Sequence, residues 1–480
     1  MQDILNFIEG RHEPAASGEW LDDVDPATAE TYARVASSDA ADVDRAVAAA
    51  VRAFPAWSTT PAADRSRLLR RLARLIERDL EALARAESID SGKPIAAARA
   101  TDIPRAVQNF DFFADAVTQF SSEAHPTDEV ALNYTLRQPL GAVACISPWN
   151  LPLYLLSWKI APALAAGNCV VAKPSEVTPM TAHLLGGLCK EAGFPPGVLN
   201  ILQGLGPRAG GPLCAHRDVR AISFTGSTRV GGEIARESAA SFKKLSLEMG
   251  GKNPTLIFAD ADLGEAVPQA VRAAFSNTGQ ICLCGSRILI EKSVYDRVRD
   301  ELVERVRALR VGDPLDPATE QGALVSRQHF EKVMGCLSLA REEGARVLCG
   351  GERAKVSGRC ARGFFVQPTL LEGLGPACRT NQEEIFGPVA TLLPFGSAEE
   401  AVQLANSTRY GLAASLWTRD LSRAHRVSAQ LHSGIVWVNC WMFRDLRTPF
   451  GGVKESGVGR EGGMDALRFF SEPKNVCVKL

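Results

Sequence analysis

Apolar residues recur at helical spacing in the first part of the chain. Between residues 42 and 86 the sequence is rich in Ala, Arg and Leu, and apolar positions follow one another at intervals of three and four. The spacing is clearest at Leu68, Leu69, Leu72, Leu75, Ile76, Leu80 and Leu83. Because such a stripe buries one face of a helix, the pattern predicts two amphipathic helices, separated near Pro61.

The pattern changes after residue 140, where short apolar runs bounded by Gly, Pro or Asn alternate with helical stretches. These runs predict strands at 142–146, 169–172, 221–224 and 255–258, and again at 288–290, 347–349 and 435–438. Strands that alternate with helices form mostly parallel sheets. The sequence therefore predicts an α/β fold with two α/β units.

The length of the chain also favours more than one domain, because 480 residues exceed what a single hydrophobic core usually holds. We place the boundary between the units near Gly250 and Gly251, where a glycine pair follows the apolar segment 245–249 and can act as a hinge. The polar stretch 117–140 and the tail 469–480 show too little periodicity to predict an independent domain.

Composition narrows the class of protein. Hydrophobic residues make up 46% of the sequence and charged residues 23%, with a net charge of -1, which is typical of a soluble globular enzyme. Lys and Arg are spread along the chain, so nucleic-acid binding is not expected. No apolar run approaches the roughly 18 residues of a membrane helix, and the N-terminus does not resemble a secretory signal. A cytoplasmic location is the resulting expectation.

The cysteines predict neither a disulfide framework nor a metal site. The sequence contains 12 of them, scattered along the chain. The close pair Cys282 and Cys284 has no His neighbours at zinc-ligand spacing. Most are expected to be free, reduced thiols.

Three residues are candidates for catalysis. Cys282 lies three residues after Gly279, where a helix-like run breaks, and is a candidate nucleophile. Glu248 lies between apolar residues beside two glycines, so partial burial would raise its pKa and suit it as a general base. Asn150 lies between prolines at the end of a predicted strand and is a candidate oxyanion donor. Each has a structural alternative: a packed thiol, a satisfied carboxylate and a turn asparagine.

Two strand ends are candidates for cofactor binding. Segment 224–231 follows a predicted strand and opens a helix, so its free amides and the helix dipole can meet a pyrophosphate, although the full G-x-G-x-x-G fingerprint is absent. At the other strand end, Glu176 follows Lys173, and a carboxylate there can accept hydrogen bonds from ribose hydroxyls. Its charge would repel a 2′-phosphate, which favours NAD over NADP. The alternatives are an ordinary structural turn and a solvated loop.

Taken together and in this order, these segments resemble the aldehyde dehydrogenase superfamily over essentially the whole chain. The segments are PWN at 148–150, WKIAPALAAGN at 158–168, KPSE at 173–176, FTGS at 224–227, LEMGG at 247–251, GQIC at 279–282 and EIFGP at 384–388. Most of them are weak singly, but the whole set in family order is specific.

The resemblance implies a covalent mechanism. It makes Cys282 the nucleophile, Glu248 the general base, and Asn150 with the backbone amide of Cys282 the oxyanion hole. A hydride would pass to NAD, and water activated by Glu248 would hydrolyse the thioester. Because this base is present, resolution of the thioester by phosphate or coenzyme A is less favoured. The implied cofactor contacts are Trp149, Lys173, Ser175, Glu176, Gly226, Ser227, Glu384 and Phe386.

The resemblance also implies an architecture. A doubly wound NAD-binding domain would take residues 1–116 and 141–250, and an α/β catalytic domain residues 251–450. Residues 117–140 and 451–480 would form a small bridging element that builds a homodimer or homotetramer. A non-catalytic structural or binding relative is the opposing interpretation, but every chemical role is filled in this sequence.

Three further segments resemble the muconic semialdehyde dehydrogenases within the superfamily: ICLC at 281–284, NCWMFRDLRTPFGG at 439–452 and NVCVKL at 475–480. They imply 2-aminomuconate 6-semialdehyde as substrate, the branch-point aldehyde of tryptophan catabolism through kynurenine. The 2-hydroxy analogue and a broader aldehyde range are the alternatives. Such a substrate carries a carboxylate, and Arg105 and Arg444 are the candidate residues to bind it.

Overall fold

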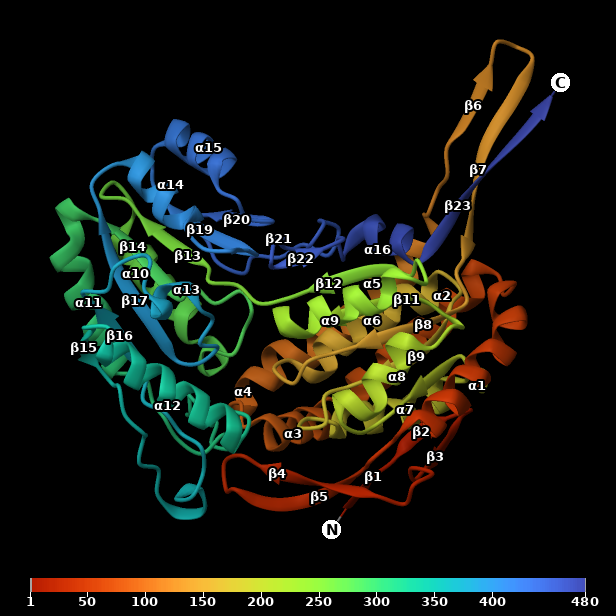
Figure 1. Ribbon diagram of the computed structural model, residues 1–480, viewed down its shortest axis with the longest axis horizontal. Helices are drawn as coiled ribbons and strands as arrows, with labels where there is room; N and C mark the ends of the chain where they lie inside the picture. Colours follow the sequence, from red (N-terminus) through yellow and green to blue (C-terminus); the bar gives the residue numbers. More distant parts are fainter. Residues whose placement is uncertain (1, 480) are drawn as a thin grey trace.

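Two helix-covered sheets form the body of the molecule, and a three-stranded arm projects from it (Figure 1). The computed structural model describes residues 2–479. Both large sheets are mostly parallel, because their strands alternate with helices along the chain. The predicted α/β fold class is confirmed.

The first sheet has five parallel strands at its centre and antiparallel strands at both edges. Its order is β22 (Gly457–Val458), β12 (Lys244–Glu248), β11 (Val219–Thr225), β8 (Ala142–Ile146), β9 (Cys169–Lys173), β10 (Leu199–Ile201), β2 (Asn6–Ile8) and β3 (Arg11–Glu13). Strands β8 and β9 are buried along their whole length, as expected for continuous apolar runs covered on both faces.

The helices around this sheet share one hydrophobic core with it. They are α1 (Ala40–Ser58), α2 (Ala62–Arg78), α3 (Leu80–Ser91), α5 (Ile103–Thr118), α6 (Pro152–Ala165), α7 (Met180–Ala192), α8 (Gly211–Ala215) and α9 (Thr228–Ala239). The break predicted near Pro61 is confirmed, since Pro61 immediately precedes α2. The prediction of two helices is wrong, however, because the chain leaves helical geometry again at Asp79. Apolar spacing continues across this residue, so periodicity alone does not reveal the break.

The second sheet is covered by helices on both faces. Its order is β15 (Arg346–Cys349), β16 (Thr369–Glu372), β17 (Val389–Phe395), β14 (Arg287–Glu291), β13 (Pro254–Ile257), β19 (Ala413–Trp417) and β20 (Ile435–Val438). One face packs against α10 (Leu263–Phe275) and α11 (Tyr295–Arg307), and the other against α14 (Ala398–Asn406) and α15 (Leu421–Gln430). Helix α12 (Arg327–Glu342) adds a separate core beside β16. All seven predicted strands exist in the two large sheets, with ends that differ by at most two residues.

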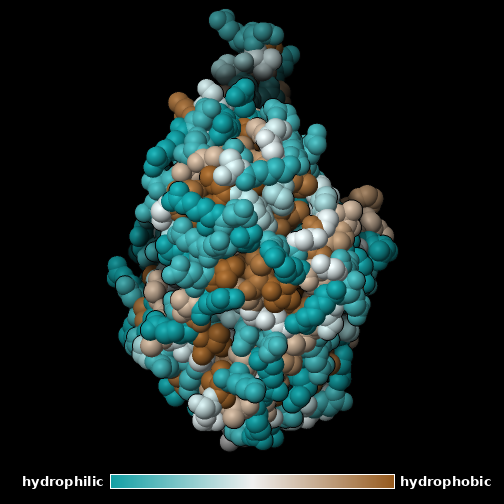
Figure 2. Space-filling model, turned by 90° about the vertical axis from the view of Figure 1, so that its left-hand side faces the viewer, coloured by the Kyte–Doolittle hydropathy of each residue, from teal (hydrophilic) through white to brown (hydrophobic). Residues whose placement is uncertain are grey.

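The outward faces of these helices are polar. Figure 2 shows the face that lies on the left of Figure 1, where hydrophilic residues predominate around smaller apolar areas. Within residues 2–479, no helix is both long enough and apolar enough to cross a membrane.

The arm consists of β6 (Ala124–Thr127), β7 (Ala131–Pro139) and β23 (Ser471–Lys479), paired antiparallel. It takes up only part of the predicted bridging ranges, because β22 joins the first sheet and α16 (Gly463–Phe469) packs on α6. Met1 and Leu480, which end the predicted ranges, lie outside the described residues. A small N-terminal sheet contains β1 (Gln2–Ile4), β5 (Glu30–Ala36) and β4 (Trp20–Asp25).

Short elements complete the chain. They are α4 (Ile95–Ala97), η1 (Ala98–Asp102), η2 (Gly206–Gly210), η3 (Ser276–Gly279), η4 (Lys292–Val294), η5 (Gly358–Cys360), α13 (Arg379–Gln382), β18 (Tyr410–Gly411) and β21 (Val453–Lys454).

The topology of the first sheet predicts where a ligand binds. From β8 the chain continues through α6 to β9 on one side, whereas β11 lies on the other side. The carboxyl ends of these strands meet at one edge, since Ile146 pairs with both Phe224 and Lys173. Ligands of doubly wound sheets bind outside the carboxyl ends of the strands, at the point where the strand order reverses. The candidate site therefore lies next to β8 and β11.

Candidate active site

A cavity of about 560 Å³ lies at this edge of the first sheet, and we call it the sheet-edge cavity. Nine of the residues predicted from the sequence line it: Trp149, Asn150, Ser175, Glu176, Gly226, Ser227, Cys282, Glu384 and Phe386. They come from the ends of β8, β9 and β11 in the first sheet and from the segments that precede β14 and β17 in the second sheet. The fold thus brings together segments more than 200 residues apart in the sequence.

One wall of the sheet-edge cavity is the N-terminus of α9. Ser227 caps this helix, because its side chain accepts a hydrogen bond from the amide of Val230 at 3.3 Å. Among the described residues, the amides of Thr228 and Arg229 have no acceptor. Free amides and the helix dipole together form a site that attracts an anion such as a phosphate group.

Glu176 lines the same cavity, whereas Lys173 does not. The Lys173 side chain is buried below the cavity, where its Nζ donates to the Pro174 carbonyl at 2.9 Å and lies 3.4 Å from Glu176 Oε2. Burial lowers the pKa of Lys173, and the attraction of Glu176 opposes this effect. Lys173 therefore contacts Glu176 rather than lining the cavity itself.

The opposite wall is built around Glu384. Its Oε1 accepts a hydrogen bond from the Gly251 amide at 3.0 Å, and burial raises its pKa. Gly250 permits this approach, because a Cβ there would overlap the Glu384 carboxylate. The rings of Trp149 and Phe386 meet edge to face at 5.2 Å beside it.

Helix α12 adds wall residues that sequence reasoning missed. Gln328, His329 and Lys332 line the sheet-edge cavity, and the His329 ring lies 4.9 Å from that of Trp149. Burial lowers the pKa of His329 to about 4, so this ring is neutral at physiological pH. Their positions on an ordinary amphipathic helix gave no signal of this role.

Cys282 is positioned by a strained turn. Helix α10 ends at Phe275, before the break predicted at Gly279, and Asn277 and Thr278 then take left-handed φ angles of 51° and 56°. Such angles are costly for residues other than glycine and tend to occur at functional sites. The backbone is also held at Cys282 itself, because Asn253 Nδ2 donates a hydrogen bond to the Cys282 carbonyl at 2.7 Å.

The Cys282 thiol lies between two cavities. It lines the sheet-edge cavity and also a small second cavity, the inner chamber, which it shares with Tyr154, Glu248, Arg444, Phe450 and Glu461. Burial raises the pKa of the thiol to about 12; Glu384 and Glu248 add to this shift, and Arg444 opposes it. The thiol is therefore protonated until a base removes its proton.

Glu248 is the basic group of the inner chamber. It ends β12, is 3% exposed, and neither carboxylate oxygen has a hydrogen-bond partner among the described residues. Burial raises its pKa well above the ordinary value, and the nearby Glu461 raises it further. The predicted direction of this pKa shift is confirmed.

A buried ion pair lies beside Glu248 and was not identified from the sequence. Lys159 Nζ lies 2.6 Å from Glu461 Oε1, and Lys159 opposes the rise in the pKa of Glu248. One signal was present, since Lys159 is the single charged residue in the wholly buried α6 and must have a partner. Nothing in the sequence indicated that the partner lies 302 residues away.

Two hydrogen-bond donors face the same cavity as the thiol. Asn150 Nδ2 donates one hydrogen to the Gln280 carbonyl at 2.8 Å, which leaves its second hydrogen free. The backbone amide of Cys282 has no acceptor among residues 2–479. This pair has the composition of an oxyanion hole.

The two predicted substrate arginines both lie near Tyr154. Arg444 lines the inner chamber, its guanidinium is 4.2 Å from the Phe450 ring centre, and its Nη1 donates to the Tyr154 hydroxyl at 2.8 Å. Arg105 lies 5.6 Å from the centre of the Tyr154 ring but lines neither cavity. No ion pair to either arginine is found within residues 2–479.

This arrangement has the parts of a thiol-dependent enzyme: a thiol, a buried carboxyl group and two free hydrogen-bond donors, next to a cavity that fits a phosphate-bearing cofactor. The chain belongs to the aldehyde dehydrogenase family, whose model matches residues 13–476. The resemblance inferred from the sequence is confirmed.

Individual relatives are similar to this chain over essentially its full length. The 2-aminomuconic semialdehyde dehydrogenase of Danio rerio is 50% identical over 479 residues, which cover 99% of this chain and 98% of that protein. The 2-hydroxymuconic semialdehyde dehydrogenase of Pseudomonas sp. (strain CF600) is 46% identical over 100% of both chains. An NAD+ complex of aldehyde dehydrogenase from Bacillus cereus has a TM-score of 0.97 at 40% identity, covering 100% of this chain and 97% of that one.

Proposed function

We propose that this protein oxidises 2-aminomuconate 6-semialdehyde to 2-aminomuconate with NAD, through a thioester on Cys282, in the kynurenine branch of tryptophan catabolism. One observation carries the choice of substrate. Arg444 lines the inner chamber beside Cys282 and Glu248, and among the described residues it has no carboxylate partner. A cation that has no counter-ion next to a catalytic thiol favours a substrate with a negative group.

The sheet-edge cavity fits NAD. The free amides at the N-terminus of α9 suit its pyrophosphate, and the Glu176 carboxylate suits unmodified ribose hydroxyls and repels a 2′-phosphate. The relatives solved with NAD agree with this choice. When bound, NAD supplies the hydride acceptor.

The residues of this chain supply the remaining chemistry. The Cys282 thiol gives up its proton to solvent water, its Sγ bonds to the aldehyde carbon, and the resulting oxyanion accepts hydrogen bonds from Asn150 Nδ2 and the Cys282 amide. After the hydride has left, a thioester remains. Glu248 takes a proton from water, the water oxygen bonds to the acyl carbon, and the carbon–sulfur bond breaks.

The 2-hydroxy analogue is the second candidate substrate. A relative at 46% identity carries that name, and the two substrates differ in only one small group. Broader aldehyde oxidation is the third candidate.

A substrate panel tests the proposal. The rate of NADH formation is compared for the two muconic semialdehydes and an uncharged aldehyde of similar length, with NAD and with NADP.

A charge-assisted hydrogen bond is worth roughly 1.5 to 3 kcal/mol, so Arg444→Ala should lower kcat/KM for the muconic substrates about ten-fold or more. The uncharged aldehyde should be affected little.

The matched control is Arg447→Ala, which removes an exposed arginine of the same loop that is paired with Asp445. It should leave all rates unchanged. If Arg444→Ala lowers both classes of substrate equally, or neither, Arg444 does not bind the carboxylate and the muconic assignment loses its support.

We propose further that the protein acts in the cytoplasm as a homodimer or homotetramer. None of the 12 cysteines, all of which lie within residues 2–479, forms a disulfide, as expected in a reducing compartment. The arm carries exposed apolar side chains that suit contact with a second copy: Val130, Leu132, Leu136 and Val478.

A further inference from the structure

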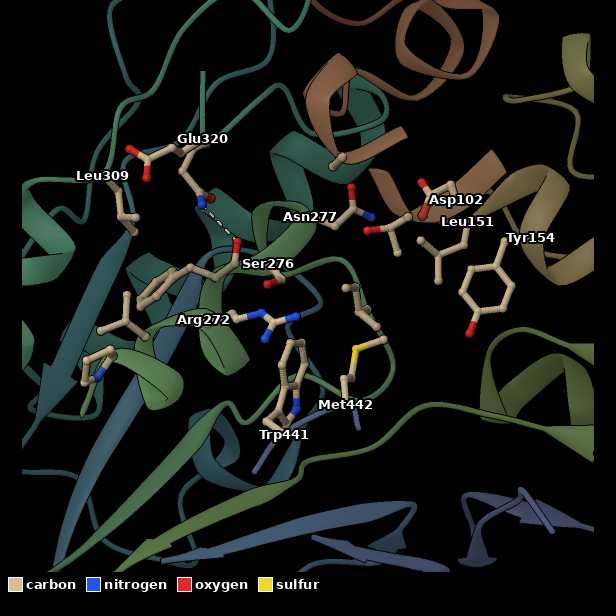
Figure 3. A pocket seen from close by; sticks show the side chains of 17 residues that line it. Asp102, Leu151, Tyr154, Arg272, Ser276, Asn277, Leu309, Glu320, Trp441 and Met442 are labelled. Carbon is tan, nitrogen blue, oxygen red and sulfur yellow. Dashed lines mark hydrogen bonds between the residues drawn. The ribbon is translucent and has the colours of Figure 1, made fainter. Parts of the chain in front are cut away.

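The hydroxyl group of Tyr154 is buried between two cavities. The residue is 2% exposed and belongs to the first turn of α6. It lines the inner chamber and also a larger entrance cavity of about 410 Å³. Figure 3 shows this entrance cavity, with Tyr154 and Leu151 across from Arg272 and Trp441. Tyr154 thus belongs to the walls of both cavities, and the inner chamber is the one that Cys282 also lines.

The Tyr154 hydroxyl accepts a hydrogen bond in this structure but does not donate one to the described residues. Its oxygen accepts a hydrogen bond from Arg444 Nη1 at 2.8 Å. Its own proton has no acceptor among residues 2–479. A buried phenol normally donates as well as accepts, so a donor left free at a cavity wall points to a ligand.

Two aromatic rings and the Tyr154 hydroxyl hold the Arg444 side chain in place. Its guanidinium lies 4.2 Å from the Phe450 ring centre and 5.5 Å from that of Trp158. Only one of its N–H groups has an acceptor among the described residues, the Tyr154 hydroxyl. The guanidinium and the phenol are thus adjacent donors.

The rest of the inner chamber offers no second cationic residue, and its one other hydroxyl group belongs to Thr225. Much of its wall is apolar, contributed by Leu151, Leu155, Met249, Ile281, Leu283, Met442 and Phe450. Its two carboxyl-bearing residues, Glu248 and Glu461, are acidic, so neither supplies a positive charge for a carboxylate. The end formed by Tyr154 and Arg444 is therefore where an anionic group of a substrate is stabilised.

We propose that Tyr154 is a specificity-determining residue whose phenol donates a hydrogen bond to one oxygen of the substrate carboxylate, while Arg444 binds the other oxygen. This inference rests on the proposed function, because it requires a substrate with a carboxylate. Two adjacent donors suit the two oxygens of a carboxylate, and the neutral phenol adds selectivity without a second buried charge.

Tyr154→Phe tests the inference, because it removes only the hydroxyl. The ring remains beside Arg105, and the backbone carbonyl still accepts from Asn109 Nδ2. For the muconic semialdehydes kcat/KM should fall about ten-fold, mainly through a higher KM. For the uncharged aldehyde and for NAD, kcat/KM should stay within about two-fold of the wild type.

Tyr410→Phe is the matched control. Tyr410 is also buried and also accepts a hydrogen bond from an arginine, Arg409, at 3.0 Å, but it lines none of the three cavities. Its removal should leave both substrate classes unchanged. An equal loss in Tyr154→Phe and Tyr410→Phe would overturn the inference.

A double-mutant cycle with Arg444→Ala separates this inference from the proposed function. If both residues bind one carboxylate, the losses of kcat/KM in the two single variants should be strongly non-additive in the double variant.

A selective loss in Arg444→Ala with no loss in Tyr154→Phe would overturn the role of Tyr154 and leave the proposed substrate intact. An equal loss for charged and uncharged aldehydes in Tyr154→Phe would show that the hydroxyl only supports the chamber, and would also overturn it. No turnover of muconic semialdehydes by the wild type would overturn both.

Discussion

At the residue scale, Glu248 shows how a buried carboxyl group, proposed here as the catalytic base, weakens the fold that holds it. A buried carboxyl group without a hydrogen-bond partner is costly once it is ionised. Burial and the neighbouring Glu461 raise its pKa in the folded protein, so it keeps a proton that it loses in the unfolded chain. Once it has lost this proton, the Glu248 carboxylate is a stronger base toward water than an ordinary glutamate.

This pKa shift predicts a stability effect. Between the unfolded and the folded pKa of Glu248 the folded state binds more protons, so the free energy of unfolding falls as pH rises. Each pH unit in this window costs about 1.4 kcal/mol at most. Glu248→Gln does not titrate, so its Tm should exceed that of the wild type, and the difference should grow from about pH 5 to about pH 8.

Thermal unfolding at both pH values measures the difference, with Glu129→Gln, an exposed residue of the arm, as the control. If the Tm difference between Glu248→Gln and the wild type does not change with pH, Glu248 is not held in its protonated form.

The sequence predicted some site residues better than others. Cys282, Glu248 and Asn150 lie within short motifs, and the fold brings them to adjoining cavities. Lys159 and Glu461 form a pair that no motif joins, and their contact depends on tertiary folding. For Arg105, the sequence could not show that its side chain lies near the Tyr154 ring but does not line the chamber.

At the scale of elements, apolar runs predicted strands well because the parallel strands are buried on both faces. Strand β8, which is buried along its whole length, has the predicted bounds. Strand β20 also has them, although it is an edge strand and mostly half-buried. The arm strand β23 was missed, because it extends away from the core and most of its residues are exposed, so burial imposes no apolar alternation on it. The turn before Cys282 was also misplaced, because left-handed Asn277 and Thr278 contradict local preference.

At the scale of the whole molecule, the arm is the feature that suggests assembly. It projects from the body, and Leu136 on β7 is 42% exposed (Figure 1). An apolar side chain on a projecting sheet is stabilised when a second copy covers it. Leu136→Asp should therefore shift the oligomer toward smaller species, as measured by light scattering after size-exclusion chromatography.

The control for this prediction is Leu421→Asp on α15, since Leu421 is 73% exposed but lies on the body. It should keep the mass of the wild type. A monomeric wild type, or an unchanged mass for Leu136→Asp, would contradict the role of the arm.

The thioester on Cys282 is the central claim, and the mass of this residue tests it most directly. Glu248→Ala is mixed with NAD and aldehyde, quenched in acid and digested. Because the variant lacks the base for water attack, it should release about one NADH per active site in a burst and carry the acyl group on the peptide that contains Cys282. Cys282→Ser should show neither the burst nor the added mass. Wild-type steady-state turnover by Glu248→Ala, or a burst without added mass on Cys282, would contradict the mechanism.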